Sequence, residues 1–157
     1  MYKKVSTDMN FVEREKQVEK FWEDNQIFEK SMKVREGNPS YVFYDGPPTA
    51  NGKPHIGHVE TRVIKDMIPR YRTMKGYMVP RKAGWDTHGL PVELEVEKLL
   101  GLDGKEQIEQ YGVEPFIEKC KESVWKYKGM WEDFSSTVGF WADMDNPYIT
   151  YDDNFIE

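Results

Sequence analysis

The chain has 157 residues, a formal net charge of −6 at pH 7 and an aromatic content of 14%, enough for one domain with a packed core. The acidic charge argues against a free-standing nucleic-acid-binding domain, because such domains usually carry a basic excess. A single cysteine, Cys120, excludes an internal disulfide, and no apolar run approaches the roughly 18 residues of a membrane span. We therefore expect a cytoplasmic protein with no membrane partner.

The N-terminal part of the chain is predicted to form a helical arm. Residues 10 to 30 show helical periodicity, with Asn10 as a candidate N-cap and Glu13 three residues later, the spacing of a capping box. Residues 31 to 40 lack periodicity and contain Gly and Pro, so we interpret them as a linker.

The next segment has the pattern of a strand, a helix and a second strand. Residues 41 to 45 form an apolar run, residues 56 to 75 have helical periodicity, and residues 77 to 82 form a second apolar run. Pro69 predicts a kink in the helix, and Pro80 weakens the second strand prediction. This βαβ pattern predicts an α/β fold with parallel strands.

The remaining residues give weaker signals. A short helix is predicted from Pro91 to Leu100, and a longer one from near Glu114 to Phe134, because apolar residues recur there at helical spacing. Residues 135 to 157 are aromatic and rich in turn formers, so we expect irregular structure without a closing element. That ending suggests a piece of a longer protein.

Basic residues are concentrated on the predicted helix and the strand after it. Residues 62 to 82 contain seven lysines and arginines but one acidic residue, Asp66. This distribution is typical of a solvated helix face, and a phosphate-facing patch is the alternative.

The loop between the first strand and the helix has the features of an anion-binding turn. The first N–H groups of a helix are unpaired and favour a phosphate. Gly46 and Gly52 permit unusual backbone geometry, and Pro47 is one of three prolines that stiffen the loop. His55 and His58 are three residues apart, so both rings lie on one side of the first turn and can donate hydrogen bonds to one ligand.

A second glycine-bearing turn, residues 84 to 91, follows the second predicted strand. In parallel sheets, ligands bind at the carboxyl ends of strands, so this turn and the histidine pair are expected to face one crevice. Asp86 is a candidate partner for a substrate ammonium, or alternatively an N-cap or turn former. His88 either orients Asp86 or packs without a chemical role.

Two other interpretations of the histidine pair remain open. The pair can be an exposed or capping arrangement without chemistry. It can also share a zinc ion, with His88 or Asp86 completing the ligand shell, although no cysteine lies nearby in sequence. A P-loop is excluded, because the chain lacks Gly-x-x-x-x-Gly-Lys-Ser/Thr.

Three sequence blocks resemble a known enzyme family. Residues 54 to 58, Pro-His-Ile-Gly-His, are similar to the His-Ile-Gly-His signature of the class I aminoacyl-tRNA synthetases. Residues 44 to 52, Tyr-Asp-Gly-Pro-Pro-Thr-Ala-Asn-Gly, and 84 to 93, Gly-Trp-Asp-Thr-His-Gly-Leu-Pro-Val-Glu, resemble the isoleucyl-tRNA synthetase family in particular. The resemblance covers essentially the whole chain.

This resemblance implies a Rossmann-like nucleotide fold, with residues 1 to 40 as the arm and linker and residues 41 to 157 as the first half of the catalytic domain. The implied reaction joins isoleucine to ATP and transfers the product to tRNA(Ile), with Mg²⁺ bound mainly through the ATP phosphates. By resemblance, ATP is bound by Thr49, Asn51, His55, Gly57 and His58, the two histidines being catalytic, and the amino acid by Gly46, Pro47, Asp86 and His88. It assigns no metal ligand to this chain.

The chain contains no Lys-Met-Ser-Lys-Ser loop, which in this family belongs to the second half of the nucleotide fold. Editing, anticodon-binding and zinc elements of the family are also missing. We therefore expect an N-terminal fragment with little activity of its own, from a parent protein that is a monomer. Alternatives are another branched-aliphatic class I synthetase, another nucleotidyltransferase with the same histidine pair, and a non-catalytic paralogue that binds an amino acid or tRNA.

Overall fold

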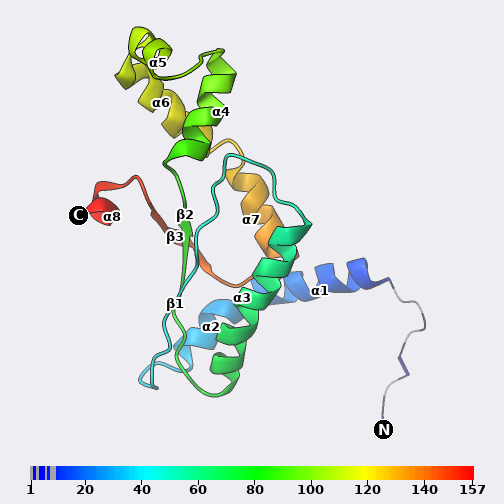
Figure 1. Ribbon diagram of the computed structural model, residues 1–157. Helices are drawn as coiled ribbons and strands as arrows, with labels where there is room; N and C mark the ends of the chain where they lie inside the picture. The colour runs from blue at the N-terminus through cyan, green and yellow to red at the C-terminus, as the bar shows by residue number, and fades with distance from the viewer. Residues whose placement is uncertain (1, 3, 6, 8–9) are drawn as a thin grey trace.

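The computed structural model describes residues 2, 4–5, 7 and 10–157, and it has an α/β fold (Figure 1). Its three-stranded sheet has the order β1-β2-β3, formed by β1 (Phe43–Tyr44), β2 (Arg81–Trp85) and β3 (Asp143–Ile149). Both strand pairs are parallel, with Phe43 opposite Arg81 in the first and Lys82 opposite Asp143 in the second. The predicted fold class is confirmed.

Eight helices are found in the described residues. They are α1 (Phe11–Asp24), α2 (Ile27–Lys33), α3 (Ile56–Met74), α4 (Leu90–Leu100), α5 (Lys105–Tyr111), α6 (Val113–Val124), α7 (Lys128–Thr137) and α8 (Asp153–Ile156). In Figure 1, α4, α5 and α6 form a group beyond one end of the sheet, while α3 and α7 lie beside the strands. None of the helices in the described ranges is long and apolar enough to cross a lipid bilayer.

The strand β1, the helix α3 and the strand β2 form the predicted βαβ unit. The second strand lies later than expected, at Arg81–Trp85 instead of residues 77 to 82. Pro80 lacks an amide donor, although its carbonyl accepts from Phe43 N–H at 2.9 Å. Gly84 and Trp85, which the sequence placed in a turn, are therefore strand residues, and the predicted kink at Pro69 stays a prediction.

The predicted helix at residues 10 to 30 is two helices. Asn10 caps α1 as predicted, its side chain accepting from Glu13 N–H at 3.1 Å. The break follows Asn25, whose side chain donates to the Phe21 carbonyl at 2.9 Å. Gln26 then has φ of 50°, a left-handed conformation that ends the first helix. The proposed domain division at residue 40 stays a prediction.

Three further elements differ from expectation. The helix predicted from Glu114 to Phe134 is divided into α6 and α7 by a turn at residues 125 to 127. The helix α5 was not predicted. The largest difference is β3, because residues 135 to 157 were expected to be irregular and instead supply the third strand and α8. Pro147 lies inside that strand, which is tolerated because β3 is at the edge of the described sheet.

The core lies between the loop after β1, the end of β2 and α7. Ala50, Trp85 and Trp131 are almost completely buried there. The indole N–H of Trp131 donates to the Gly52 carbonyl at 2.8 Å, so α7 holds the loop in place. An aromatic contact joins the N-terminal arm to the body, because the Trp22 and Trp141 rings lie 5.0 Å apart, edge to face.

Gly84 is required by the close packing of β2 and β3. A Cβ atom at residue 84 would overlap the ring of Tyr148. That ring cannot move aside easily, because its hydroxyl donates to the Asp45 carbonyl and its face stacks on Phe155 at 5.5 Å. We expect Gly84→Ala to lower the free energy of unfolding by about 1–3 kcal/mol, measured by urea denaturation.

The matched control for this prediction is Gly129→Ala on α7. A Cβ atom there meets nothing within 4 Å, and alanine is the better helix former, so this variant should be neutral or slightly stabilising. Equal stabilities of the two variants would contradict the proposed overlap.

Candidate functional site

The two histidines of the predicted site form a reciprocal cap at the start of α3. His55 is the N-cap residue, and its Nδ1 accepts from Gly57 N–H at 3.2 Å. Three residues later, Nδ1 of His58 accepts from the backbone N–H of His55 at 3.0 Å. The rings lie together, with centroids 3.8 Å apart. This is the capping-box arrangement with histidine in both positions.

The cap determines which ring nitrogens can meet a ligand. A nitrogen that accepts an N–H hydrogen bond carries no proton, so each neutral ring is protonated at Nε2. His55 and His58 therefore each have an Nε2–H donor that the cap does not use. The capping role and the ligand-binding role, which the sequence analysis treated as alternatives, are compatible in this geometry.

Gly57 lies close to one ring of the same cap. A Cβ atom at residue 57 would lie 3.1 Å from Cε1 and 3.2 Å from Nδ1 of the His55 ring. A larger residue would require the ring to shift by a few tenths of an ångström. The His55 ring thus lies next to the position that a side chain at residue 57 would occupy.

The surroundings of His58 favour its neutral form. Burial is the main cause that lowers its pKa below the ordinary value of 6.5, and the neighbouring His55, Arg62 and Lys65 lower the pKa further. The Trp131 ring lies against it, edge to face, at 4.7 Å. Neutral His58 retains the Nδ1 lone pair that the cap requires.

Because of His58, the protein is expected to become less stable as the pH is lowered. Folding lowers the pKa of His58, so the unfolded chain binds protons more readily than the folded one. The contribution of His58 to the free energy of unfolding is therefore complete above the unfolded pKa of 6.5. That contribution is lost as pH falls through the lower pKa of the folded state. We expect thermal unfolding between about pH 7.5 and about pH 5 to show a smaller decline in His58→Asn, since asparagine can accept the His55 N–H without titrating. An unchanged pH profile in that variant would contradict this role.

A cavity of about 330 Å³ lies between the loop after β1 and the first turns of α3. It lies where the predicted anion-binding loop meets the helix, and no residue of the turn at residues 84 to 91 lines it. Its lining residues are Gly46, Pro47, Pro48, Thr49, His58, Thr61, Arg62, Lys65 and Trp131.

Beneath this cavity, a buried carboxylate holds two cations of α3. Asp45 Oδ1 lies 2.8 Å from Lys65 Nζ, and its Oδ2 lies 3.6 Å from Arg62 Nη1. The Asp45 side chain is 1% exposed and that of Arg62 5% exposed. Burial lowers the pKa of Arg62, and Asp45 opposes that shift. Lys65 also donates to the Gly46 carbonyl at 3.1 Å, which fixes the start of the loop.

Two arginines of the basic segment do not lie on a solvated face. Arg62 and Arg81 are only 4% and 3% exposed, and their partners are Asp45 and Asp66. Lys65, which is partly exposed, remains beside the cavity as a cation that a phosphate could approach. Of the two interpretations of this segment, the solvated face is wrong for the two buried arginines.

The second glycine-bearing turn is joined directly to the first. The Asp86 amide donates to the Pro48 carbonyl at 3.0 Å, and Thr49 Oγ1 donates to Asp86 Oδ2 at 3.1 Å. Further along, the Asn51 side chain donates to the Pro91 carbonyl at 3.0 Å. Thr49, Asn51 and Asp86 thus connect the two predicted binding segments without lining the cavity together.

His88 is placed differently from the other predicted residues. Its Nδ1 lies 2.7 Å from Thr150 Oγ1, so the ring bonds Thr150 and not Asp86. His88 lines a separate cavity of about 360 Å³ between this turn and α4 and α6. Of the two interpretations of His88, a direct hydrogen bond to Asp86 is not found among the described residues.

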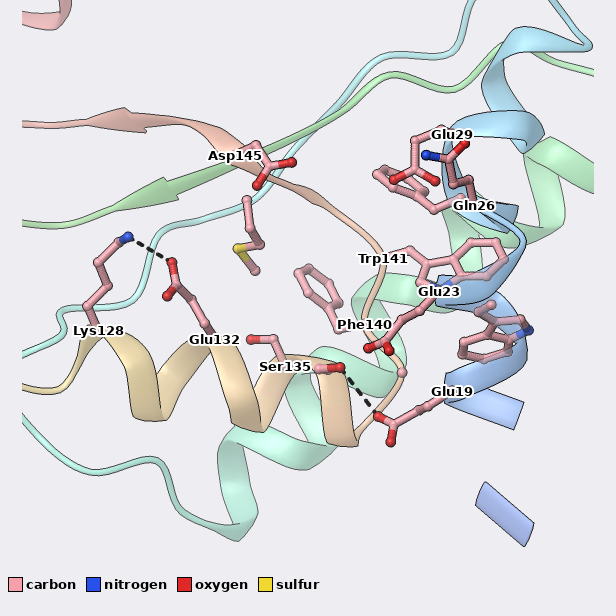
Figure 2. A pocket seen from close by; sticks show the side chains of 15 residues that line it. Glu19, Glu23, Gln26, Glu29, Lys128, Glu132, Ser135, Phe140, Trp141 and Asp145 are labelled. Atoms are coloured by element: carbon pink, nitrogen blue, oxygen red, sulfur yellow. Dashed lines mark hydrogen bonds and ion pairs between the residues drawn. The ribbon is translucent and has the colours of Figure 1, made fainter. Parts of the chain in front are cut away.

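A larger cavity lies elsewhere. Figure 2 shows a groove of about 810 Å³ between the N-terminal arm, α7 and the start of β3. Some of its lining side chains pair with one another: Lys128 Nζ lies 2.9 Å from Glu132, and Ser136 Oγ lies 3.5 Å from Glu19. None of the predicted site residues lines it, so size alone does not identify the site. Within the described residues, no three His, Cys, Asp or Glu side chains are arranged to hold a metal ion.

Fold and site together define the class of protein. A family model described as tRNA synthetases class I (I, L, M and V) matches residues 17–157, and the chain belongs to that family. Within the family, its whole length is similar to isoleucine–tRNA ligases.

Similarity to the isoleucine–tRNA ligases is high in two bacterial genera. Identity is 62% with the enzyme of Clostridium kluyveri and 60% with that of Clostridium novyi, over 100% of this chain and 15% of each relative. Identity is 57% with the enzyme of Bacillus thuringiensis, over 99% of this chain and 15% of the relative. The chain thus spans about 15% of the length of the curated relatives it matches.

A solved structure supports the fold. The chain is similar to a structure titled as the ternary complex of Agrobacterium radiobacter K84 agnB2 LeuRS-tRNA-LeuAMS, with a TM-score of 0.63. That match covers 95% of this chain and 17% of the other at 20% identity, so it shows the Rossmann-like synthetase fold alone.

Sequence reasoning missed the residues that support the site from other elements. Lys65 and Arg62 were noted only as part of a basic segment, and Trp131 only as a helix residue. Thr150 had no signal, because its segment was expected to be irregular. The one usable signal was the helical spacing of Arg62 and Lys65 after His58, which places all three on one side of α3.

Proposed function

We propose that the chain forms part of an isoleucine-activating site in a longer polypeptide. That polypeptide joins isoleucine to ATP and transfers the aminoacyl group to tRNA(Ile), acting in the cytoplasm as a monomer. The observation that carries the proposal is the reciprocal histidine cap, which leaves two Nε2–H donors beside the N-terminus of α3. Membership of the class I synthetases and identity to isoleucine–tRNA ligases support the choice of substrate.

In this proposal, the histidine pair and the helix N-terminus bind the triphosphate. The Nε2–H groups of His55 and His58 would donate to phosphate oxygens, where negative charge develops during activation. Thr49 and Asn51 belong to the loop that precedes α3, and Gly57 would provide a backbone surface for the adenine ring. Lys65 adds a positive charge at the cavity wall.

Asp86 would hold the amino acid. Thr49 occupies its Oδ2, and no hydrogen bond to Oδ1 is found among the described residues, which leaves that oxygen for a substrate ammonium. Gly46 and Pro47, at the cavity wall, would lie beside the substrate, and His88 would complete the turn. The carboxylate of isoleucine would then be oriented toward the α-phosphorus by binding alone, without a protein nucleophile.

Mg²⁺ would be held mainly by the ATP phosphates, where it supplies charge neutralisation. The structure is consistent with this assignment, because the carboxylate beneath the cavity, Asp45, is already engaged by Arg62 and Lys65. The protein groups at the cavity are accordingly donors and cations, which suit phosphate oxygens more than a metal ion.

Isoleucine-dependent ATP–pyrophosphate exchange in the longer polypeptide tests the proposal. His58→Asn is the informative variant, because asparagine can still accept the His55 N–H but has no donor at the Nε2 position. We expect exchange to fall by roughly 10²- to 10³-fold with little loss of stability near neutral pH. Glu60→Gln, an exposed carboxylate on α3, is the control and should leave exchange unchanged.

Two results would contradict the proposal: exchange that does not depend on isoleucine, or full exchange in His58→Asn. The isolated 157-residue chain is expected to exchange far more slowly than ordinary enzymes, which turn over at roughly 1–10³ s⁻¹. Turnover in that range by this chain alone would contradict the expectation that activity needs the Lys-Met-Ser-Lys-Ser loop.

A further inference from the structure

A buried cluster of hydroxyl groups holds the Thr87–His88 turn, which directly follows Asp86. Thr87 and Thr150 are 4% and 7% exposed. Thr150 Oγ1 accepts from the Thr87 backbone N–H at 3.0 Å and lies 3.2 Å from Thr87 Oγ1. The same oxygen lies 2.7 Å from Nδ1 of His88. Thr150 follows β3 directly, and its own N–H donates to the Trp85 carbonyl at 3.2 Å.

Counting donors and acceptors selects one proton arrangement. A hydroxyl group has one hydrogen and two lone pairs. If Thr150 donates to His88 Nδ1, its lone pairs accept from the Thr87 N–H and the Thr87 hydroxyl. Thr87 Oγ1 then accepts from Tyr151 N–H, which lies 3.0 Å away. Both hydroxyl hydrogens and the backbone N–H groups of Thr87 and Tyr151 then have a partner within the cluster.

The opposite arrangement leaves a buried donor unused. If His88 Nδ1 carried the proton, Thr150 would accept from His88 and Thr87 N–H and donate to Thr87 Oγ1. Thr87 Oγ1 would then accept from Thr150 and from Tyr151, and its own hydrogen would have no acceptor in this cluster. Leaving a buried hydroxyl hydrogen unpaired is unfavourable, so the first arrangement is preferred.

We propose that Thr150 is a positioning residue of the amino-acid site, because its hydroxyl holds the Thr87–His88 turn against β3 and keeps His88 protonated at Nε2. Asp86 directly precedes this turn, and it is held on its other side by Pro48 and Thr49. The carboxylate is therefore fixed from both sides. The effect on amino-acid binding rests on the proposed function, whereas the proton arrangement does not.

The first test is nuclear magnetic resonance of the 157-residue chain. At about pH 8, above the ordinary titration range of histidine, the ¹⁵N signals of His88 should show the proton on Nε2 and a hydrogen-bonded Nδ1. In Thr150→Val, the Nδ1 signal should shift to that of a free acceptor, and Thr150→Ser should restore the native signal. A proton on Nδ1 of His88 in the unmodified chain would overturn the proposal.

Amide exchange separates a local change from general unfolding. The Thr87 amide bonds Thr150 Oγ1, while the adjacent Asp86 amide bonds the Pro48 carbonyl. In Thr150→Val, protection of Thr87 should be lost while that of Asp86 is retained, and Thr150→Ser should protect both. Unchanged protection of Thr87 in the valine variant would also overturn the proposal.

The kinetic test uses the longer polypeptide. We expect Thr150→Val to raise KM for isoleucine by roughly 10- to 100-fold, with kcat and KM for ATP changed by less than about twofold. Thr150→Ser should be close to the unmodified enzyme, and Thr137→Val, an exposed threonine on α7, is the control. An unchanged KM for isoleucine in the valine variant would overturn the positioning role. An enzyme without exchange activity would refute the proposed function, while the two measurements above would still decide the hydroxyl arrangement.

Discussion

Asp66→Asn is expected to lower the free energy of unfolding by about 3–5 kcal/mol, the typical cost of leaving a buried cation without its partner. Asp66 Oδ1 lies 3.5 Å from Arg81 Nη1 and accepts from Trp141 N–H at 3.1 Å. The second oxygen is paired with Arg70. Arg81 has a side chain that is only 1% exposed, and burial lowers its pKa to about 10 in spite of Asp66.

The loss would also affect the N-terminal arm. Arg70 and Arg81 both lie over the Trp141 ring, at 3.9 Å and 5.6 Å from its centroid. Trp141 in turn contacts Trp22 of α1 and Phe28 of α2. In the part of the chain that the structure describes, Asp66 is the carboxylate paired with both arginines. We therefore expect its loss to loosen the contact between arm and body together with the global loss of stability.

Urea denaturation of the 157-residue chain measures this effect. The matched control is Asp24→Asn, which removes a carboxylate from an exposed i,i+4 pair with Lys20 and should change stability little. The double variant Asp66→Asn with Arg81→Met should recover part of the loss, because it also removes the stranded charge. A loss in Asp66→Asn no greater than in the control would contradict this account of the cluster.

Asp45→Asn should have a comparable effect on stability, about 3–5 kcal/mol, and a second effect on the site. Asp45 is the counter-ion of Arg62, which lies 4.5 Å from the centroid of the Phe140 ring. It also anchors Lys65, which holds the Gly46 carbonyl. Removing the negative charge leaves the buried Arg62 without its counter-ion and frees Lys65, which fixes the loop.

Stability and activity can be separated for this residue. Calorimetry measures the loss of stability, and pyrophosphate exchange in the longer polypeptide, at a temperature where the variant stays folded, measures the effect on the site. We expect exchange to fall by roughly 100-fold. Adding Arg62→Met should recover stability but not exchange, because Lys65 still lacks its anchor. Full exchange in a folded Asp45→Asn variant would refute the role of Asp45 in holding the loop.

The local elements of the site could be predicted because they depend on short sequence spacings. The order of strand, Gly- and Pro-rich loop and helix from residue 41 to α3 is visible in consecutive residues, and so is the spacing of His55 and His58. The reciprocal cap follows from that spacing. Its proton arrangement needed the observed contacts, since either ring nitrogen could have accepted.

Elements that depend on tertiary contacts were not predictable in the same way. β3 contains Pro147 and acidic residues and has no alternating pattern, so only its pairing with β2 makes it a strand. Thr150 supports the turn at residues 86 to 88 from more than 60 positions away, a contact that no local spacing reveals.

His55 and His58 give Nδ1 to the cap of α3, and in the proposed function they give Nε2–H to a triphosphate. The most direct test is ¹⁵N nuclear magnetic resonance of the histidine rings in the longer polypeptide during addition of ATP. We predict that both rings are protonated at Nε2 before ATP is added, and that both Nε2 signals shift with ATP while the His88 signals do not. Protonated Nδ1 atoms, or Nε2 signals of His55 and His58 that ignore ATP, would contradict the claim.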